Sequence, residues 1–194
     1  MNVLITSVGK RVVLTKKFQE TLKRFYSDSK VFTTDMNPDM APAGIISDGC
    51  FVVPKVTATD YIDKLLQICK EQKVGIIIPT IDTELLILAE NKELFQKNGI
   101  EPIVSDLAFI QACRDKRNTS TFLSEHDIRV PAPVDKHHPA FPLFAKPYDG
   151  SLSKDLYVVR NREELTPEIL NHPKLIFMEY IDKREYKEFT VDMY

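Results

Sequence analysis

The chain has no long hydrophobic run, because nowhere in its 194 residues does an apolar stretch approach the ~20 residues of a membrane-spanning helix. Its first residues, Met1 to Ile5, carry no basic segment and favour a first strand over a secretory signal. An excess of one charge is also missing, since 26 Lys and Arg residues face 28 Asp and Glu residues. The net charge of −2 gives no electrostatic reason to bind nucleic acid or an anionic membrane.

Cysteine is scarce as well. Cys50, Cys69 and Cys113 are odd in number and widely spaced, so they form no zinc or redox motif. A reduced cytoplasmic compartment is the simplest interpretation, with the thiols as small buried apolar groups. The four histidines lie in expected loops or at helix ends, and no spacing among them suggests a metal site. We therefore predict no metal-ligating residue in this chain.

Glycine is the third shortage: the chain has six, and none follows Gly150. The loop 7–11, which opens a helix after the first strand, contains a single glycine, Gly9. It matches neither Gly-x-Gly-x-x-Gly nor the P-loop pattern, which disfavours a classical dinucleotide or P-loop site. Its amides suit an anion, but an ordinary strand-to-helix turn explains the loop equally well. Asp35 follows the second strand, and without the fingerprint a turn or capping role is favoured over a ribose contact.

Strand and helix patterns alternate through the first 113 residues. Residues 75–79 have no polar alternation, so they predict a strand buried on both faces, as in a parallel sheet. Asp82 or Thr83 can cap the helix that follows, and Asn98-Gly99 can end it. Strands are expected at 3–6, 31–34, 50–53, 75–79 and 102–104, and helices around 14–25 and 59–72. We predict an α/β domain over residues 1–113, a Rossmann-like parallel sheet of five strands with helices on both faces.

A proline-rich stretch at 130–139 marks a change in composition. We predict a helix and linker over residues 114–140 and a second unit over residues 141–194. Its order is α+β, unlike that of the first domain. Strands are expected at 143–146, 156–159, 175–180 and 188–193, with a short helix at 162–170.

The second unit combines groups that suit a nucleoside triphosphate. A strand ends in Lys146, a polar loop follows, another strand ends in Glu179, and the next begins at Glu188. Cations bind phosphate, loop amides cradle it, and carboxylates accept hydrogen bonds from the sugar and base. Taken alone, Lys146 is an ordinary strand-end lysine and Glu179 an exposed strand acid. The polar loop contains Gly150, Ser151 and Ser153.

The order and spacing of these motifs resemble the ATP-grasp superfamily, in the branch near the carbamoyl-phosphate synthetase large subunit. The resemblance covers nearly the whole chain. It implies a pre-ATP-grasp domain followed by the small lobe of an incomplete ATP-grasp domain. The earlier residues that carry it are Gly9-Lys10-Arg11, Asp35 with Pro38, Ile78-Pro79 with Ile81-Asp82, and Asp115-Lys116.

The resemblance also implies roles for single residues. Lys116 and Lys146 reach the phosphates, and the loop of Gly150, Ser151 and Ser153 folds over them. Glu179 and the backbone of Tyr180 and Ile181 meet the adenine. Glu188 holds the ribose, with Glu185 as a rival. This sequence departs from the pattern at Leu152 and Asp155, where glycines are usual, and Asp155 would repel phosphate.

The activity that the resemblance implies is that of an ATP-dependent carboxylate–amine (C–N) ligase acting through an acyl-phosphate. ATP, Mg²⁺ and a small carboxylate are the expected ligands, and a homodimer is left open. The magnesium carboxylates of such proteins belong to a large lobe after Tyr194, so we expect a truncated chain that alone does not turn over ATP. Its catalytic residues are unknown. Two alternatives stay open: a non-catalytic nucleotide-binding or scaffold protein, and a Rossmann-type protein that binds a nucleotide-sugar or dinucleotide.

Overall fold

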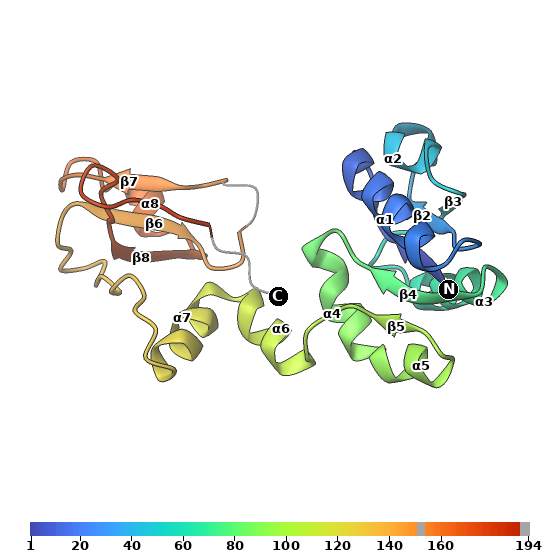
Figure 1. The fold of residues 1–194 in the computed structure, drawn as a ribbon. Coiled ribbons are helices and arrows are strands. Elements are labelled where there is room, and N and C mark those ends of the chain that lie inside the picture. The colour runs from blue at the N-terminus through green and yellow to red at the C-terminus, as the bar shows by residue number, and fades with distance from the viewer. Residues whose placement is uncertain (151–153, 191–194) are drawn as a thin grey trace. The chain divides into compact units, whose positions relative to one another are not determined.

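The computed structural model describes residues 1–150 and 154–190 of the chain (Figure 1). The chain divides into two compact units, residues 1–110 and residues 111–194, and each is described by itself. No helix within the described ranges is long and apolar enough to cross a lipid bilayer.

A parallel sheet of five strands forms the centre of the first unit. The strand order is β3-β2-β1-β4-β5, so the chain starts in the middle and extends the sheet first toward one edge and then toward the other. This confirms the predicted α/β class with a five-stranded parallel sheet. The strands are β1 (Asn2–Ile5), β2 (Val31–Asp35), β3 (Cys50–Val52), β4 (Val74–Ile78) and β5 (Glu101–Pro102).

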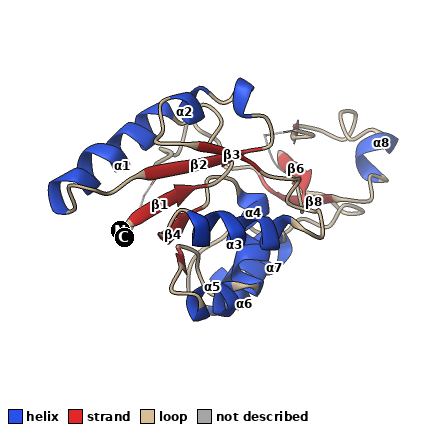
Figure 2. Cartoon of the chain, turned by 90° about the vertical axis from the view of Figure 1, so that its right-hand side faces the viewer, coloured by secondary structure: helices blue, strands red, loops and turns tan. Residues whose placement is uncertain are grey.

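Helices cover both faces of this sheet (Figure 2). One face packs against α1 (Val12–Phe25) and against α2 (Pro42–Ile45), which follows a short 3-10 turn, η1 (Pro38–Met40). Because β1 is covered on both sides, Val3, Leu4 and Ile5 are all buried. The other face packs against α3 (Tyr61–Glu71), α4 (Asp82–Glu90) and α5 (Lys92–Lys97).

The helix expected to run from Asp82 or Thr83 to Asn98 is two helices, and the expectation of one was wrong. The chain leaves α4 at Asn91, whose side chain donates to the carbonyl oxygen of Ile87 at 2.8 Å. A side chain that bonds its own backbone competes with the helix, so the break falls there. Neither proposed cap forms: the N-cap residue is Ile81, and Asp82 is already helical.

The second unit is built on an antiparallel sheet of three strands in the order β7-β6-β8. Two helices come before it: α6 (Leu107–Arg114) lies where the chain passes from the first unit to the second, and α7 (Lys116–Glu125) starts the second. A third helix, α8 (Pro167–Leu170), precedes β8. The strands are β6 (Leu143–Pro147), β7 (Tyr157–Val159) and β8 (Leu175–Glu179).

Two elements of this unit were predicted wrongly. The helix expected at 162–170 covers only Pro167–Leu170, because Pro167 has no N–H to donate and is suited to the first helical position. The strand expected at 188–193 does not form over 188–190, and 191–193 lie outside the described residues. The edge of β8 is already paired, since Val134 donates to Phe177 and Glu179 donates to Ala132.

Candidate functional site

Successive side chains along β6, β7 and β8 point to opposite faces of the three-stranded sheet. One of these faces is covered by other parts of the unit, and the other is more open. Leu143, Ala145 and Phe177 point to the covered face and are buried in a core that α8 closes. On the opposite face the register sets Lys146 beside Ile176, and Phe144 between Met178 and Val158. We call this the open face because its side chains are partly exposed, apart from that of Met178. Its members are Phe144, Lys146, Val158, Ile176 and Met178.

Lys146 stands at one end of the open face without an anionic partner. Its ammonium makes no hydrogen bond or ion pair with any residue in 1–150 or 154–190, and the Phe144 ring centroid is 6.0 Å away. Burial lowers the pKa of Lys146, and the positive charge of Lys116 lowers it further. Lys146 is therefore a half-buried cation with a second cation near it.

Lys116 is the first residue of α7, where Asp115 caps the helix by accepting from the amide of Arg117 at 2.8 Å. The Lys116 amide donates to the Tyr148 carbonyl oxygen at 2.9 Å. Its ammonium donates to the Gly150 carbonyl oxygen at 2.7 Å. The structure thus brings Lys116, Lys146 and Gly150 together. Ser151 and Ser153, the other predicted loop residues, lie outside the described ranges, as does Leu152.

Two positions in the loop after Lys146 suit glycine, Gly150 because of the space around it and Asp155 because of its backbone angle. A Cβ atom on Gly150 would lie 3.0 Å from Cβ of Pro147, so only glycine packs here without displacing the proline ring. Asp155, one of the departures from the family pattern, has a φ of 54°, in the left-handed region that glycine adopts most readily. Aspartate tolerates this region better than most residues. Its side chain is exposed.

The predicted adenine residues lie at the far end of the sheet. Glu179 pairs with Leu143 and so shares the covered face, opposite to the face of Lys146. Its amide donates to the carbonyl oxygen of Ala132 at 2.8 Å. Tyr180 is half-buried and lines a cavity of about 470 Å³, whereas Ile181 is exposed.

Glu188, the predicted ribose acid, is not brought to Lys146. Its carboxylate accepts from the Lys183 ammonium at 2.6 Å, and both side chains are exposed. That bond lowers the pKa of Glu188. Its rival Glu185 is also exposed, and its amide donates to the carbonyl oxygen of Asp182. Both acids belong to the segment after β8 that forms no strand.

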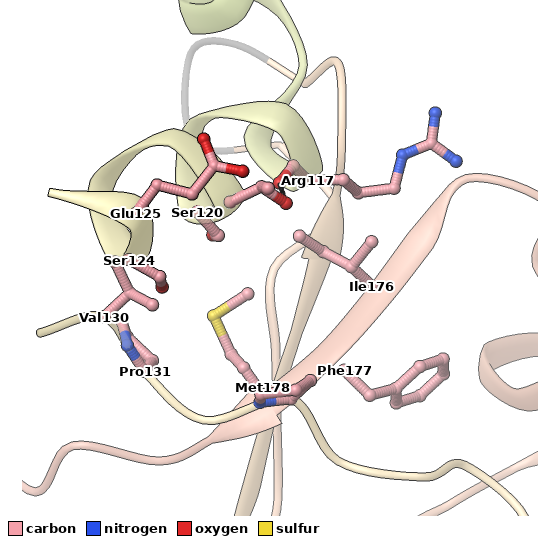
Figure 3. A pocket seen from close by; sticks show the side chains of 11 residues that line it. Arg117, Ser120, Ser124, Glu125, Val130, Pro131, Ile176, Phe177 and Met178 are labelled. Atoms are coloured by element: carbon pink, nitrogen blue, oxygen red, sulfur yellow. Dashed lines mark hydrogen bonds between the residues drawn. The ribbon is translucent and has the colours of Figure 1, made fainter. Parts of the chain in front are cut away.

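A larger cavity of about 650 Å³ opens between α7 and β8. Figure 3 shows Met178 directed into it from β8, with Ser120, Ser124 and Glu125 on the side of α7. Residues Ile176 and Met178 belong to both this cavity and the open face. The α7 side of this cavity was not predicted from the sequence. Its spacing is helical, but the residues that α7 contributes are polar and resemble a solvated helix surface.

The glycine-poor loop 7–11 of the first unit forms hydrogen bonds to neighbouring segments of the same unit. The Gly9 amide donates to the Asp35 carboxylate at 3.0 Å, and the Asn37 amide donates to it at 2.9 Å. Of the turn or capping role predicted for Asp35, the turn is observed in the bond from Asn37, whereas the N-cap residues of α1 and η1 are Arg11 and Asn37. The Arg11 guanidinium donates to the carbonyl oxygen of Thr80. These bonds describe a strand-to-helix turn held in place by its neighbours.

Glu84, the acid two residues after Asp82, is fully buried. Its carboxylate accepts from Thr6 at 2.7 Å, from Ser7 at 2.7 Å and from the Tyr61 hydroxyl at 2.5 Å. Burial raises the pKa of Tyr61, and the Glu84 charge adds to this rise. Glu84 therefore ties the end of β1 to α3 and α4.

Within the part of the chain that the structure describes, no three His, Cys, Asp or Glu side chains gather as a metal site would require. Asp149, three residues after Lys146, is paired with Lys174 at 2.6 Å. The described residues therefore fit an anion beside Lys146 but supply no magnesium ligand set.

Comparison with known proteins identifies a family and structures with a similar fold. The family described as "PylC-like, N-terminal domain" matches residues 3–103. The comparison with curated proteins finds no match. Among solved structures, biotin carboxylase from Campylobacter jejuni in a β,γ-ATP complex is 15% identical, with a TM-score of 0.65 over 94% of this chain and 45% of that one.

Two other solved structures are similar. The biotin carboxylase domain dimer of Hydrogenobacter thermophilus 2-oxoglutarate carboxylase, with magnesium ADP and bicarbonate, is 15% identical, with a TM-score of 0.63 over 93% of this chain and 44% of that one. D-alanine–D-alanine ligase from Bacillus anthracis is 15% identical, with a TM-score of 0.55 over 94% of this chain and 58% of that one.

At such identities the likeness concerns the fold, which is that of the N-terminal regions of these ATP-grasp proteins. The chain spans about half the length of the structures that it matches. The specific likeness to carbamoyl-phosphate synthetase is not among these findings. The family match covers more than half of the chain, which therefore belongs to the family described as PylC-like, N-terminal domain.

Proposed function

We propose that the second unit forms one wall of an ATP site in an ATP-dependent carboxylate–amine ligase related to the carbamoyl-phosphate-synthetase group. In this proposal, residues 1–113 are the pre-ATP-grasp domain, 114–140 a helix and linker, and 141–194 the start of the ATP-grasp domain. Turnover through an acyl-phosphate is proposed for the whole protein, and its catalytic residues are not assigned.

The observation that carries the proposal is the ammonium of Lys146, which has no hydrogen-bond or ion-pair partner among residues 1–150 and 154–190. Burying a cation next to another cation is unfavourable, and the lowered pKa of Lys146 reflects both effects. A polyanion bound between Lys146 and Lys116 would relieve the repulsion and form charge-assisted hydrogen bonds. A triphosphate supplies such an anion.

The row next to Lys146 suits the other end of a nucleotide. Phe144, Met178 and Val158 stand side by side across the open face, two residues from Lys146 along β6. Two strand residues span about 7 Å. A planar base stacks on apolar and aromatic side chains, so the open face offers phosphate contacts at one end and a base platform at the other.

The described residues do not support a magnesium step. Asp149 is neutralised by Lys174, and Glu179 shares the covered face. The role that we propose for this chain is therefore limited to binding and orientation. Lys146 and Lys116 hold the phosphates, and the apolar row keeps water from one side of the base.

Titration of the 194-residue chain with ATP and with inorganic tripolyphosphate, followed by NMR, tests the proposal. Lys146→Met should weaken binding of both by about 10-fold or more, the value of a lost charge-assisted hydrogen bond of roughly 1.5–3 kcal/mol. Lys187→Met is the matched control, because Lys187 is an exposed lysine of the same unit. Equal losses in the two variants, or none in either, would contradict the assignment.

A further inference from the structure

Two consecutive residues of α7, Lys116 and Arg117, contact the segment after Lys146. Lys116 donates to the carbonyl oxygens of Tyr148 and Gly150. The Arg117 guanidinium lies over the ring of Tyr148, with its central carbon 3.9 Å from the ring centroid. The contacts of Lys116 and Arg117 thus hold Tyr148 and Gly150, directly after the strand that carries Lys146.

Arg117 is itself held in one orientation. Its Nε donates to both carboxylate oxygens of Asp115, at 3.0 Å and 3.1 Å, and a terminal nitrogen donates to one of them. The bond to Arg117 lowers the pKa of Asp115. A planar guanidinium can be held at one edge by a carboxylate and still stack on an aromatic ring, whereas an ammonium cannot do both. Figure 3 shows the guanidinium directed away from Met178.

We infer that Arg117 and Tyr148 are positioning residues, whose stack fixes the start of α7 against the end of β6 and so sets the spacing of Lys116 and Lys146. Neither residue needs to touch the anion. The positive charge of Arg117 is paired with the Asp115 carboxylate and is therefore not directed at a ligand. The inference takes its purpose from the proposed function, since the spacing matters only if an anion binds between the two ammonium groups.

The structure contains a reporter of that spacing. The pKa of Lys146 is lowered in part by the charge of Lys116, and this part weakens as the two groups move apart. Tyr148 is half-buried, and Tyr148→Phe removes only its hydroxyl, so that variant separates the effect of the hydroxyl from the effect of the ring. If the pKa of Lys146 changes when the Tyr148 ring is lost, either the distance between Lys116 and Lys146 or the burial of Lys146 has changed. Repeating the measurement in the Lys116→Met variant separates these two causes.

The experiment follows the Lys146 side-chain signal by NMR as a function of pH in the ligand-free 194-residue chain. Tyr148→Leu should move the pKa of Lys146 back toward that of an ordinary lysine, and Tyr148→Phe should leave it as in the wild type. Arg117→Lys keeps the charge and removes the held stack, so it should act like Tyr148→Leu. Since the Arg117 side chain is 58% exposed, this variant should fold even if the leucine variant does not.

The decisive comparison uses the Lys116→Met background. If the stack acts through Lys116, Tyr148→Leu produces no further shift there. An equal shift with and without Lys116 would mean that the ring acts by burying Lys146, and an unchanged pKa in Tyr148→Leu would mean that the stack sets no spacing. Either result overturns the inference.

Binding gives a second measurement. Tyr148→Leu should weaken tripolyphosphate binding about 3-fold, the size of an exposed cation–π contact, and Tyr148→Phe should restore it. Equal binding by wild type and Tyr148→Leu would overturn the inference. The pKa measurement contains no ligand, so its outcome stands apart from the proposed function, which fails if the wild-type chain does not bind tripolyphosphate.

Discussion

The ammonium of Lys116 donates a 2.7 Å hydrogen bond to the carbonyl oxygen of Gly150, while Lys146, whose pKa Lys116 lowers, has no such acceptor in residues 1–150 or 154–190. The two lysines are thus unequal in the ligand-free protein. One is already bonded to the loop that follows β6, and the other is left without an anionic partner in the described residues. This inequality leads to a prediction about their order of importance.

Lys116→Met should weaken tripolyphosphate binding less than Lys146→Met does. Binding by Lys116 must first break its bond to Gly150, which is worth roughly 1 kcal/mol, so its net contribution is smaller by about 5-fold in affinity. Isothermal titration of the two variants gives the ranking. A larger loss in Lys116→Met would show that the contact with Gly150 does not compete with the anion.

Phe144→Leu should lower the affinity for ATP but not for tripolyphosphate. The substitution keeps the open face apolar and removes the aromatic ring, and base–aromatic stacking is worth about 1–3 kcal/mol. Tyr157→Phe is a suitable control, because Tyr157 packs against the core on the covered face. A parallel loss for both ligands would place the effect on the fold of the sheet rather than on the base.

Glu84→Gln should lower the free energy of unfolding of the first unit by about 1–3 kcal/mol. The glutamine amide keeps one acceptor oxygen, yet three hydroxyl groups donate to the Glu84 carboxylate. Glu101→Gln, on a partly exposed carboxylate of the same unit, should change stability little. Denaturant unfolding measures both, and equal stability of the two variants would rule out the buried network.

The raised pKa of Tyr61 predicts a loss of stability at high pH. Above the ordinary tyrosine pKa of about 10, the unfolded chain loses a proton that the folded protein keeps at Tyr61, so unfolding becomes easier as pH rises. The contribution is complete below about pH 10 and decreases by about 1.4 kcal/mol for each pH unit above it. Tyr61→Phe should show a smaller decrease, and identical pH profiles would contradict the assignment.

The cysteines should differ sharply toward a thiol reagent. Cys113 is exposed, whereas burial raises the pKa of the Cys69 thiol to about 12. Because the thiolate is the reactive form, Cys69 should remain unmodified until the first unit unfolds. Mass spectrometry after brief treatment of the Cys113→Ser and Cys69→Ser variants distinguishes the sites. Rapid modification of Cys69 in the folded chain would be the opposite result.

Most of the strands, and the place of Lys146 near the end of one, could be predicted, because the patterns that carry them are local. The apolar run at residues 75–79 predicts a buried strand, and Lys146 is followed directly by the polar loop. The break at Asn91 could not be predicted, since a helix of that length was equally consistent with the spacing. The missing strand at 188–190 depends on pairing of the β8 edge by residues 132–134, which no local pattern records.

The unpredicted parts of the site depend on register and on distant partners. Lys146 and Glu179 lie on opposite faces because β6 and β8 pair Leu143 with Glu179, and a shift of one residue would have put them together. The Glu84 network joins residues separated by 23, 77 and 78 positions in sequence. Sequence periodicity describes each element alone and does not reveal such contacts.

The most direct measurement of the central claim is the NMR titration of Lys146 with and without saturating tripolyphosphate. If Lys146 is an anion ligand, bound phosphate favours its charged form and raises its pKa, as the partner that the ligand-free protein lacks should do. The signals of exposed lysines such as Lys187 should barely move. An unchanged pKa of Lys146 in the bound state, or a shift no larger than that of Lys187, would contradict the account.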